Sequence, residues 1–160
     1  IWRIKLAFAI SAASAPLGAW FTALALASGA IWGQPMWGTW WVWDARLTSE
    51  LILLFLYFGY MGLRAAYDDP NQADRASGII AIVGVINVPI IKFSVDWWNT
   101  LHQPATISKL DNPSITADML WPLLVMIVAF NLFYGAVLMN RFRCEILNRE
   151  RNARWLPELL

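Results

Sequence analysis

The chain has 160 residues, of which 59% are hydrophobic and 14% charged, and its formal net charge is +1. This composition is too apolar for an ordinary soluble domain and is typical of an integral membrane protein. The single cysteine, Cys144, excludes an internal disulfide, a CxxC redox pair and the CxxCH motif of c-type cytochromes, and no cluster of cysteine and histidine indicates zinc.

Four hydrophobic stretches predict an all-α membrane domain over residues 1–160, because about 20 apolar residues in a helix cross the hydrocarbon core of a bilayer. We predict spans at about residues 6–31, 47–67, 76–91 and 119–140. Pro16 lies in the first span and is expected to kink it. Asn87 and Pro89 lie near the end of the third, where they either open the backbone toward a cavity or only kink the helix.

The basic residues predict the orientation of these spans. Nine of the twelve Lys and Arg residues lie before the first span, between the second and third, or after the fourth, and three lie in the two opposite loops, residues 32–46 and 92–118. The positive-inside rule therefore predicts that both termini are cytoplasmic and that both loops face outward. The basic tail at residues 141–154 could form an interfacial helix against anionic lipid.

The first outward loop contains a dense cluster of tryptophans. Four of the eleven tryptophans lie in the eight residues from Trp37 to Asp44. If this segment is helical, Trp37, Trp40, Trp41 and Asp44 share one face and form a flat shelf. A belt of interfacial tryptophans is the alternative, but a belt gains nothing from consecutive rings, whereas a porphyrin stacks well on indoles.

The second outward loop contains His102, the only histidine in the sequence, shortly after Trp97 and Trp98. A loop histidine is often only a solvated residue, but neutral imidazole also commonly holds haem iron. We therefore predict a haem site between the two loops, with His102 as the axial ligand of the iron. The predicted cofactor-binding residues are Trp37, Gly38, Trp40, Trp41, Trp43, Asp44, Arg46, Trp97, Trp98 and His102.

The charged residues after the tryptophans have structural interpretations as well. Asp44 and Thr48 could each cap the second span, and Glu50 in its first turn is favoured by the positive end of the helix dipole. Arg46 could pair with a haem propionate or simply with Asp44.

At these residues the chain resembles a known family. The segment from Trp37 to Asp44 resembles the WWD signature of haem-handling proteins, and nearly the whole chain resembles the CcmC family of cytochrome c biogenesis. Residues 45–51, ARLTSEL, and residues 97–103, WWNTLHQ, add to the similarity.

The resemblance implies a haem-binding membrane chaperone and export subunit rather than an enzyme, in the bacterial inner membrane. Such a protein holds haem b non-covalently at the periplasmic face and delivers it to the periplasmic haem chaperone CcmE. The other partners implied are the ABC transporter subunits CcmA and CcmB and the small membrane protein CcmD.

The chain also departs from the family pattern, which has six spans and two histidine ligands. His102 matches the second of these histidines, and no histidine precedes it. Together with the first residue, Ile1, this predicts that the sequence begins near the third span of the family and that another segment or a partner supplies the second ligand. Two alternatives stay open: a cytochrome c haem lyase or synthase of the same superfamily, and a permease subunit of an ABC transporter without a haem site of its own.

Overall fold

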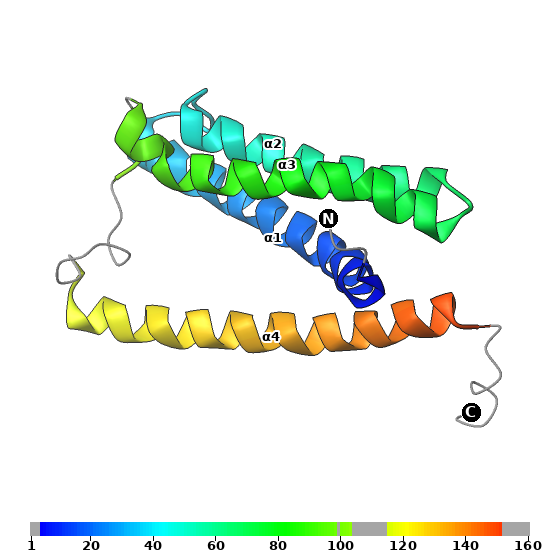
Figure 1. Ribbon diagram of the computed structural model, residues 1–160. Helices are drawn as coiled ribbons and strands as arrows, with labels where there is room; N and C mark the ends of the chain where they lie inside the picture. Colours follow the sequence, from blue (N-terminus) through cyan, green and yellow to red (C-terminus); the bar gives the residue numbers. More distant parts are fainter. Residues whose placement is uncertain (1–3, 99, 104–114, 152–160) are drawn as a thin grey trace.

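The computed structural model describes residues 4–98, 100–103 and 115–151. It consists of four helices, which are α1 (Lys5–Trp37), α2 (Ala45–Ala66), α3 (Pro70–Trp97) and α4 (Ala117–Arg149). Each is long and apolar enough to cross a membrane, and no strand occurs among the described residues (Figure 1). The prediction of an all-α membrane protein with four spans is therefore confirmed.

α1, α3 and α4 extend beyond the predicted spans at both ends, and α2 begins two residues early and ends one residue early. The C-terminal extensions of α3 and α4 contain charged residues, which end a hydrophobic stretch without ending a helix. α1 continues through Pro16, and α3 continues to Trp97, so the start of the predicted second outward loop is helical. Two of the helices, α2 and α3, begin at an aspartate that caps them. Asp69 caps α3 by accepting the N–H of Asn71, and Pro70 occupies the first helical turn, where its missing N–H has no cost.

α2 and α3 pack against each other as an antiparallel hairpin, and α1 crosses beside them (Figure 1). The side chain of Asn87 in α3 donates from Nδ2 to the carbonyl oxygen of Ser49 in α2 at 2.8 Å, and both residues are buried. This bond satisfies a buried amide that would otherwise be costly within an apolar bundle. Asn87 thus joins two helices.

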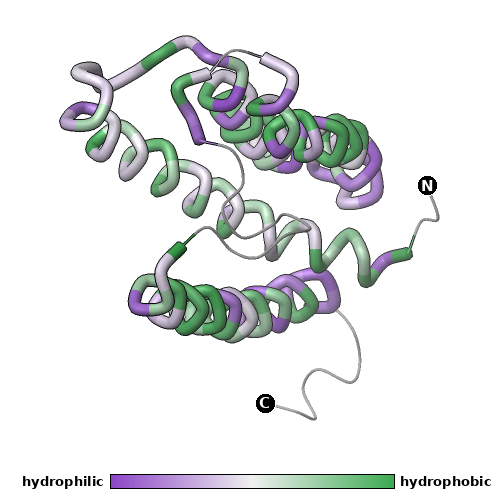
Figure 2. Tube along the Cα trace, turned by 90° about the vertical axis from the view of Figure 1, so that its left-hand side faces the viewer, coloured by the Kyte–Doolittle hydropathy of each residue, from purple (hydrophilic) through white to green (hydrophobic). Residues whose placement is uncertain are grey.

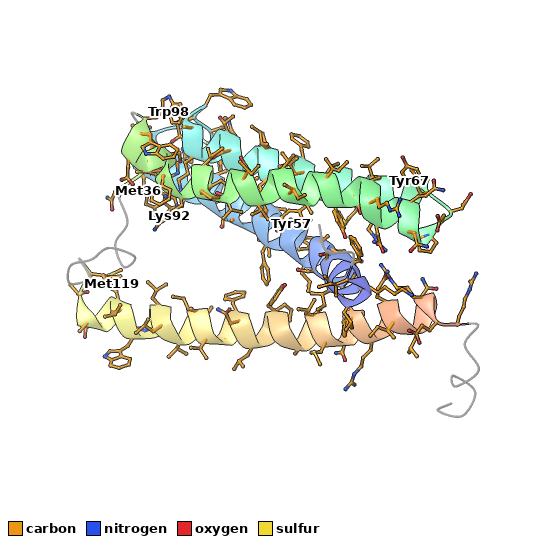
Figure 3. The ribbon with its side chains drawn as sticks, in the orientation of Figure 1. Met36, Tyr57, Tyr67, Lys92, Trp98 and Met119 are labelled. Carbon is orange, nitrogen blue, oxygen red and sulfur yellow. The ribbon has the colours of Figure 1, made fainter. Side chains whose placement is uncertain are left out.

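Small residues allow α1 to approach its neighbours. The residues that α1 buries include Ala9, Ala13, Ala15 and Ala19. The ring of Tyr57 in α2 lies over Gly18 in α1, at a place where any Cβ would overlap the ring (Figure 3). Such close approach of small residues is a common way for helices to pack in membranes, where burial from water does not drive their association.

α4 contacts α1 along part of its length. The ring of Phe21 in α1 packs edge-on against Phe130 at 6.0 Å between centroids, and the hydroxyls of Ser14 and Tyr134 are 2.7 Å apart. No described residue of α4 is buried, and hydrophobic positions run along this helix (Figure 2). Exposed apolar side chains on a membrane-spanning helix are suited to lipid or to further helices.

A four-residue ionic network joins α2, α3 and α4 at the end of the bundle near Tyr67, opposite Met36 and Trp98 (Figure 3). Arg64 pairs with Asp74 and with Glu145, whose carboxylate is 3.0 Å from its guanidinium. Arg149 pairs with the same two acids, at 2.9 Å and 2.8 Å. Since Asp74 is buried, these partners are needed to compensate its charge.

Candidate functional site

The connection from α1 to α2 is a non-helical segment, residues 38–44. α1 ends because Gly38 adopts a left-handed conformation, φ 76°, and its N–H donates to the carbonyl of Gln34 at 3.0 Å. The condition for Trp37, Trp40, Trp41 and Asp44 to share a helical face is therefore not met. The continuous helical shelf considered from the sequence does not form, because the chain turns at Gly38.

Asp44 is the residue at which α2 begins. Its Oδ1 accepts the backbone N–H of Leu47 at 2.8 Å, as an N-cap does, so the predicted capping role of Asp44 is confirmed. Thr48, the other candidate cap, lies within the first turn of the helix. The cap leaves Oδ2 of Asp44 available for a second contact.

That second contact is with His102. Nδ1 of His102 lies 2.7 Å from Oδ2 of Asp44. The hydroxyl of Thr100 donates to the same Oδ2, and its oxygen accepts the backbone N–H of His102 at 3.1 Å. The two connections that the sequence predicts to face outward are therefore joined by a hydrogen-bonded cluster of Asp44, Thr100 and His102.

The surroundings of Asp44 keep its carboxyl ionised. Burial, to 8% exposure, raises the pKa, but the hydrogen bonds from Thr100, Leu47 and the His102 ring together outweigh burial and leave the pKa below its ordinary value. A carboxylate can only accept hydrogen bonds, so it favours a proton on Nδ1 of the imidazole. Nε2 is then the nitrogen that can coordinate a metal.

Trp37, the last residue of α1, packs against the imidazole of this cluster. Its ring meets the His102 ring edge to face, with centroids 4.8 Å apart and planes at 72°. Trp32, five positions earlier in α1, packs edge-on against Trp37 at 5.2 Å. The imidazole thus contacts both a buried carboxylate and a supported indole, which restricts its orientation.

The other predicted tryptophans lie in the connection from α1 to α2 or at the end of α3. Trp40 and Trp43 are 61% and 75% exposed, and Trp97 and Trp98 are also exposed. Trp41 is partly buried, packs edge-on against Trp43, and has a buried indole N–H without a partner among the described residues. The structure brings Trp37 directly to His102 and leaves the four exposed indoles available to a ligand or a partner.

Arg46 lies in the first turn of α2 and is partly buried. Within residues 4–98, 100–103 and 115–151 it forms no ion pair with Asp44, which pairs instead with His102. Its interpretation as a simple partner of Asp44 is therefore wrong, because Leu47, Thr100 and His102 already occupy the oxygens of that carboxylate.

Comparison with known proteins agrees with the resemblance seen in the sequence. Residues 1–157 match the family model for CcmC, described as heme exporter protein C. The chain belongs to the CcmC family. The matched range includes both connections that form the cluster.

The relatives within the CcmC family are similar over almost all of this chain. Heme exporter protein C of Haemophilus influenzae is 52% identical over 159 residues, covering 99% of this chain and 65% of the relative. The protein of that name from Bradyrhizobium diazoefficiens is 54% identical, covering 93% and 57%, and that from Escherichia coli K12 is 50% identical, covering 100% and 64%. The chain therefore spans less than two thirds of the length of these curated relatives.

Sequence reasoning missed one residue of the cluster, Thr100. It lies within the WWNTLHQ stretch, two positions before His102. A threonine that accepts the N–H of the second residue after it forms a common local turn, so the spacing was a usable signal. Its bond to Asp44 across 56 positions could not be predicted from that spacing.

Proposed function

We propose that this protein is a haem-binding membrane chaperone and export subunit that holds haem between the Trp37–Asp44 segment and His102. The observation that carries the proposal is the pairing of Nδ1 of His102 with the buried Asp44 at 2.7 Å. A histidine that ligates a metal almost always has its other nitrogen held by such a partner. The haem-related names of the relatives support the same assignment.

The ligands in the chain suit haem better than a bare metal ion. No group of three or more His, Cys, Asp or Glu side chains that could hold an ion occurs among the described residues. A porphyrin supplies four nitrogen ligands to its own iron, so one protein imidazole can suffice on one side. His102 would coordinate through Nε2, while Asp44 holds the ring in position.

The exposed indoles of Trp40, Trp43, Trp97 and Trp98 would cover the apolar faces of the macrocycle. Arg46 has no carboxylate partner within 4 Å in the described part of the chain and would pair with a propionate. The partly buried Trp41 packs edge-on against Trp43, and Gly38 sets the turn of the segment.

We infer presentation of haem rather than catalysis of a reaction on it. The one cysteine, Cys144, lies in the last third of α4, whereas the cluster of Asp44 and His102 joins the other ends of α1, α2 and α3. Haem b would accordingly stay non-covalent. We propose that it is presented at the periplasmic face of the bacterial inner membrane to CcmE, in a complex with CcmA, CcmB and CcmD.

A haem titration of the purified membrane protein tests this function. The wild type is expected to bind haem stoichiometrically, and His102→Ala is expected to bind it more weakly, with a shifted Soret band. An identical spectrum and stoichiometry for His102→Ala would overturn the role of His102. Absence of stoichiometric binding by the wild type would favour a permease subunit whose tryptophans only form an interface.

Transfer to CcmE tests the partner separately. Haem-loaded wild type is expected to load purified CcmE in the presence of its complex, and His102→Ala is expected to load it less at equal total haem. If CcmE accepts haem equally from both proteins, His102 does not present the haem that is transferred.

A further inference from the structure

We propose that Thr100 is a positioning residue, whose hydroxyl holds the imidazole of His102 in the orientation and tautomer that direct Nε2 to the ligand. The inference rests on the proposed haem function and extends it to a residue that makes no contact with iron. It concerns one hydroxyl group, so a nearly isosteric substitution can test it.

The hydroxyl of Thr100 contacts three groups, which belong to Asp44 and His102. It donates to Oδ2 of Asp44, the same oxygen that lies 2.7 Å from Nδ1 of His102. Its oxygen also accepts the backbone N–H of His102 at 3.1 Å and lies 3.1 Å from Nδ1. The backbone of His102 is thus linked to the Asp44 carboxylate through Thr100, and the ring of His102 contacts the same carboxylate directly.

That carboxylate is itself fixed to α2. Oδ1 of Asp44 accepts the N–H of Leu47 at 2.8 Å, and the Asp44 side chain is almost entirely buried. The series of bonds therefore runs from the first turn of α2 through Asp44 and Thr100 to His102. A ligand held this way keeps one ring orientation, whereas a solvated loop histidine samples several rotamers.

The proton arrangement follows from the donors and acceptors. The Thr100 hydroxyl has one proton, and that proton is used toward Asp44. Nδ1 of His102 must then donate to reach the same carboxylate oxygen, which leaves the lone pair of the neutral ring on Nε2. Removing the hydroxyl frees the backbone N–H of His102 and one side of the Asp44 carboxylate, so the turn at residues 100–102 loosens.

Substitutions of Thr100 can distinguish the effect of its hydroxyl from the effect of its side-chain shape. Thr100→Val keeps the branched side chain and lacks the hydroxyl, and Thr100→Ser keeps the hydroxyl. Thr100→Ala is a second variant without the hydroxyl and without added bulk. Thr22→Val is the matched control, because among the described residues the Thr22 hydroxyl bonds only to the carbonyl of Gly18 within α1, at 2.8 Å.

Nitrogen NMR of the haem-free protein gives a readout that does not depend on activity. Because His102 is the only histidine in the sequence, its ring signals need no assignment. The wild type, Thr100→Ser and Thr22→Val are expected to show one neutral tautomer with the proton on Nδ1. Thr100→Val and Thr100→Ala are expected to show exchange between tautomers.

Haem titration then measures the effect on ligation. Loss of an outer partner of a metal-binding histidine typically costs 10- to 100-fold in affinity, so we expect about 10-fold weaker binding for Thr100→Val and Thr100→Ala. We also expect a shifted reduction potential of the bound haem, and near wild-type behaviour for Thr100→Ser.

The outcomes distinguish the two proposals. If Thr100→Val and Thr100→Ala match the wild type in tautomer and affinity while His102→Ala loses haem, the role of Thr100 is overturned and the proposed function stands. If His102→Ala also binds haem normally, the proposed function itself fails. Thermal unfolding of each variant shows whether a loss of binding reflects a loss of fold instead.

Discussion

Nδ1 of His102 lies 2.7 Å from Oδ2 of Asp44 although 58 positions separate the two residues, and Asp44 also caps the start of α2. One carboxylate therefore serves both the helix and the imidazole. Substitution can separate the capping of α2 from the contact with His102, because asparagine can cap a helix but is not a carboxylate.

Asp44→Ala and Asp44→Asn are expected to weaken haem binding similarly, because both lack the carboxylate that holds Nδ1 of His102. Asp44→Ala should also lower the free energy of unfolding by about 1 kcal/mol through loss of the cap, whereas Asp44→Asn should lower it less. Haem titration and denaturant unfolding in detergent measure the two effects. Equal haem affinity in Asp44→Asn and the wild type would contradict the positioning role of the carboxylate.

Position 38 is expected to require glycine because of its backbone conformation, and not because a side chain would lack room there. Its φ is 76°, and a Cβ there would meet nothing within 4 Å. Gly38→Ala should destabilise the protein by about 1 kcal/mol and weaken haem binding, since a left-handed residue with a Cβ is strained. Gly38→Asn should cost less, because asparagine tolerates this conformation. Thermal unfolding measures the stability of both variants, which should fall from the wild type through Gly38→Asn to Gly38→Ala. Equal stability of Gly38→Ala and the wild type would disprove the requirement for glycine.

Gly18 is expected to be required by space. A Cβ at Gly18 would overlap the ring of Tyr57, so Gly18→Ala should cost about 1–3 kcal/mol by forcing α1 and α2 apart. Gly62→Ala is the matched control, since nothing lies within 4 Å of a Cβ there and alanine favours the helix. Unfolding measurements should show a lower free energy of unfolding for Gly18→Ala only. Similar values for both would mean that Tyr57 moves away freely.

The ionic network predicts a large loss when one partner is removed. Asp74→Ala leaves Arg64 and Arg149 without the buried carboxylate that both contact, and the expected cost is about 3 kcal/mol. The exposed Asp68, in the α2–α3 connection, provides the control, and Asp68→Asn should have little effect. The measurement is unfolding at low and high salt. A small effect of Asp74→Ala would show that the helices are held mainly by apolar packing.

The exposed tryptophans distinguish a haem-binding surface from an interfacial belt. Trp40→Ala with Trp43→Ala should reduce haem retention while changing stability little, since both rings are mostly exposed. Trp121→Ala is the comparison, because Trp121 is 68% exposed at the start of α4. Haem off-rates should rise only for the first pair. Equal off-rates in all variants would favour the belt.

Much of the fold could be predicted from local features of the sequence. Hydrophobic length predicted the four spans, and the residue types at positions 44 and 48 predicted a cap at the start of α2. The helix ends were less predictable, because the last turns of α3 and α4 lie beyond the apolar stretches. Gly38 illustrates the difficulty, since a glycine permits a left-handed turn without requiring one.

The sequence by itself determined that four apolar helices form, that most tryptophans gather in the connections predicted to face outward, and that His102 is the only imidazole available. Only the tertiary structure decided that Trp37 and Asp44 converge on His102 and that Thr100 completes the cluster. The reason is physical: hydropathy and capping depend on neighbouring residues, whereas contacts across 58 positions depend on how α1, α2 and α3 pack.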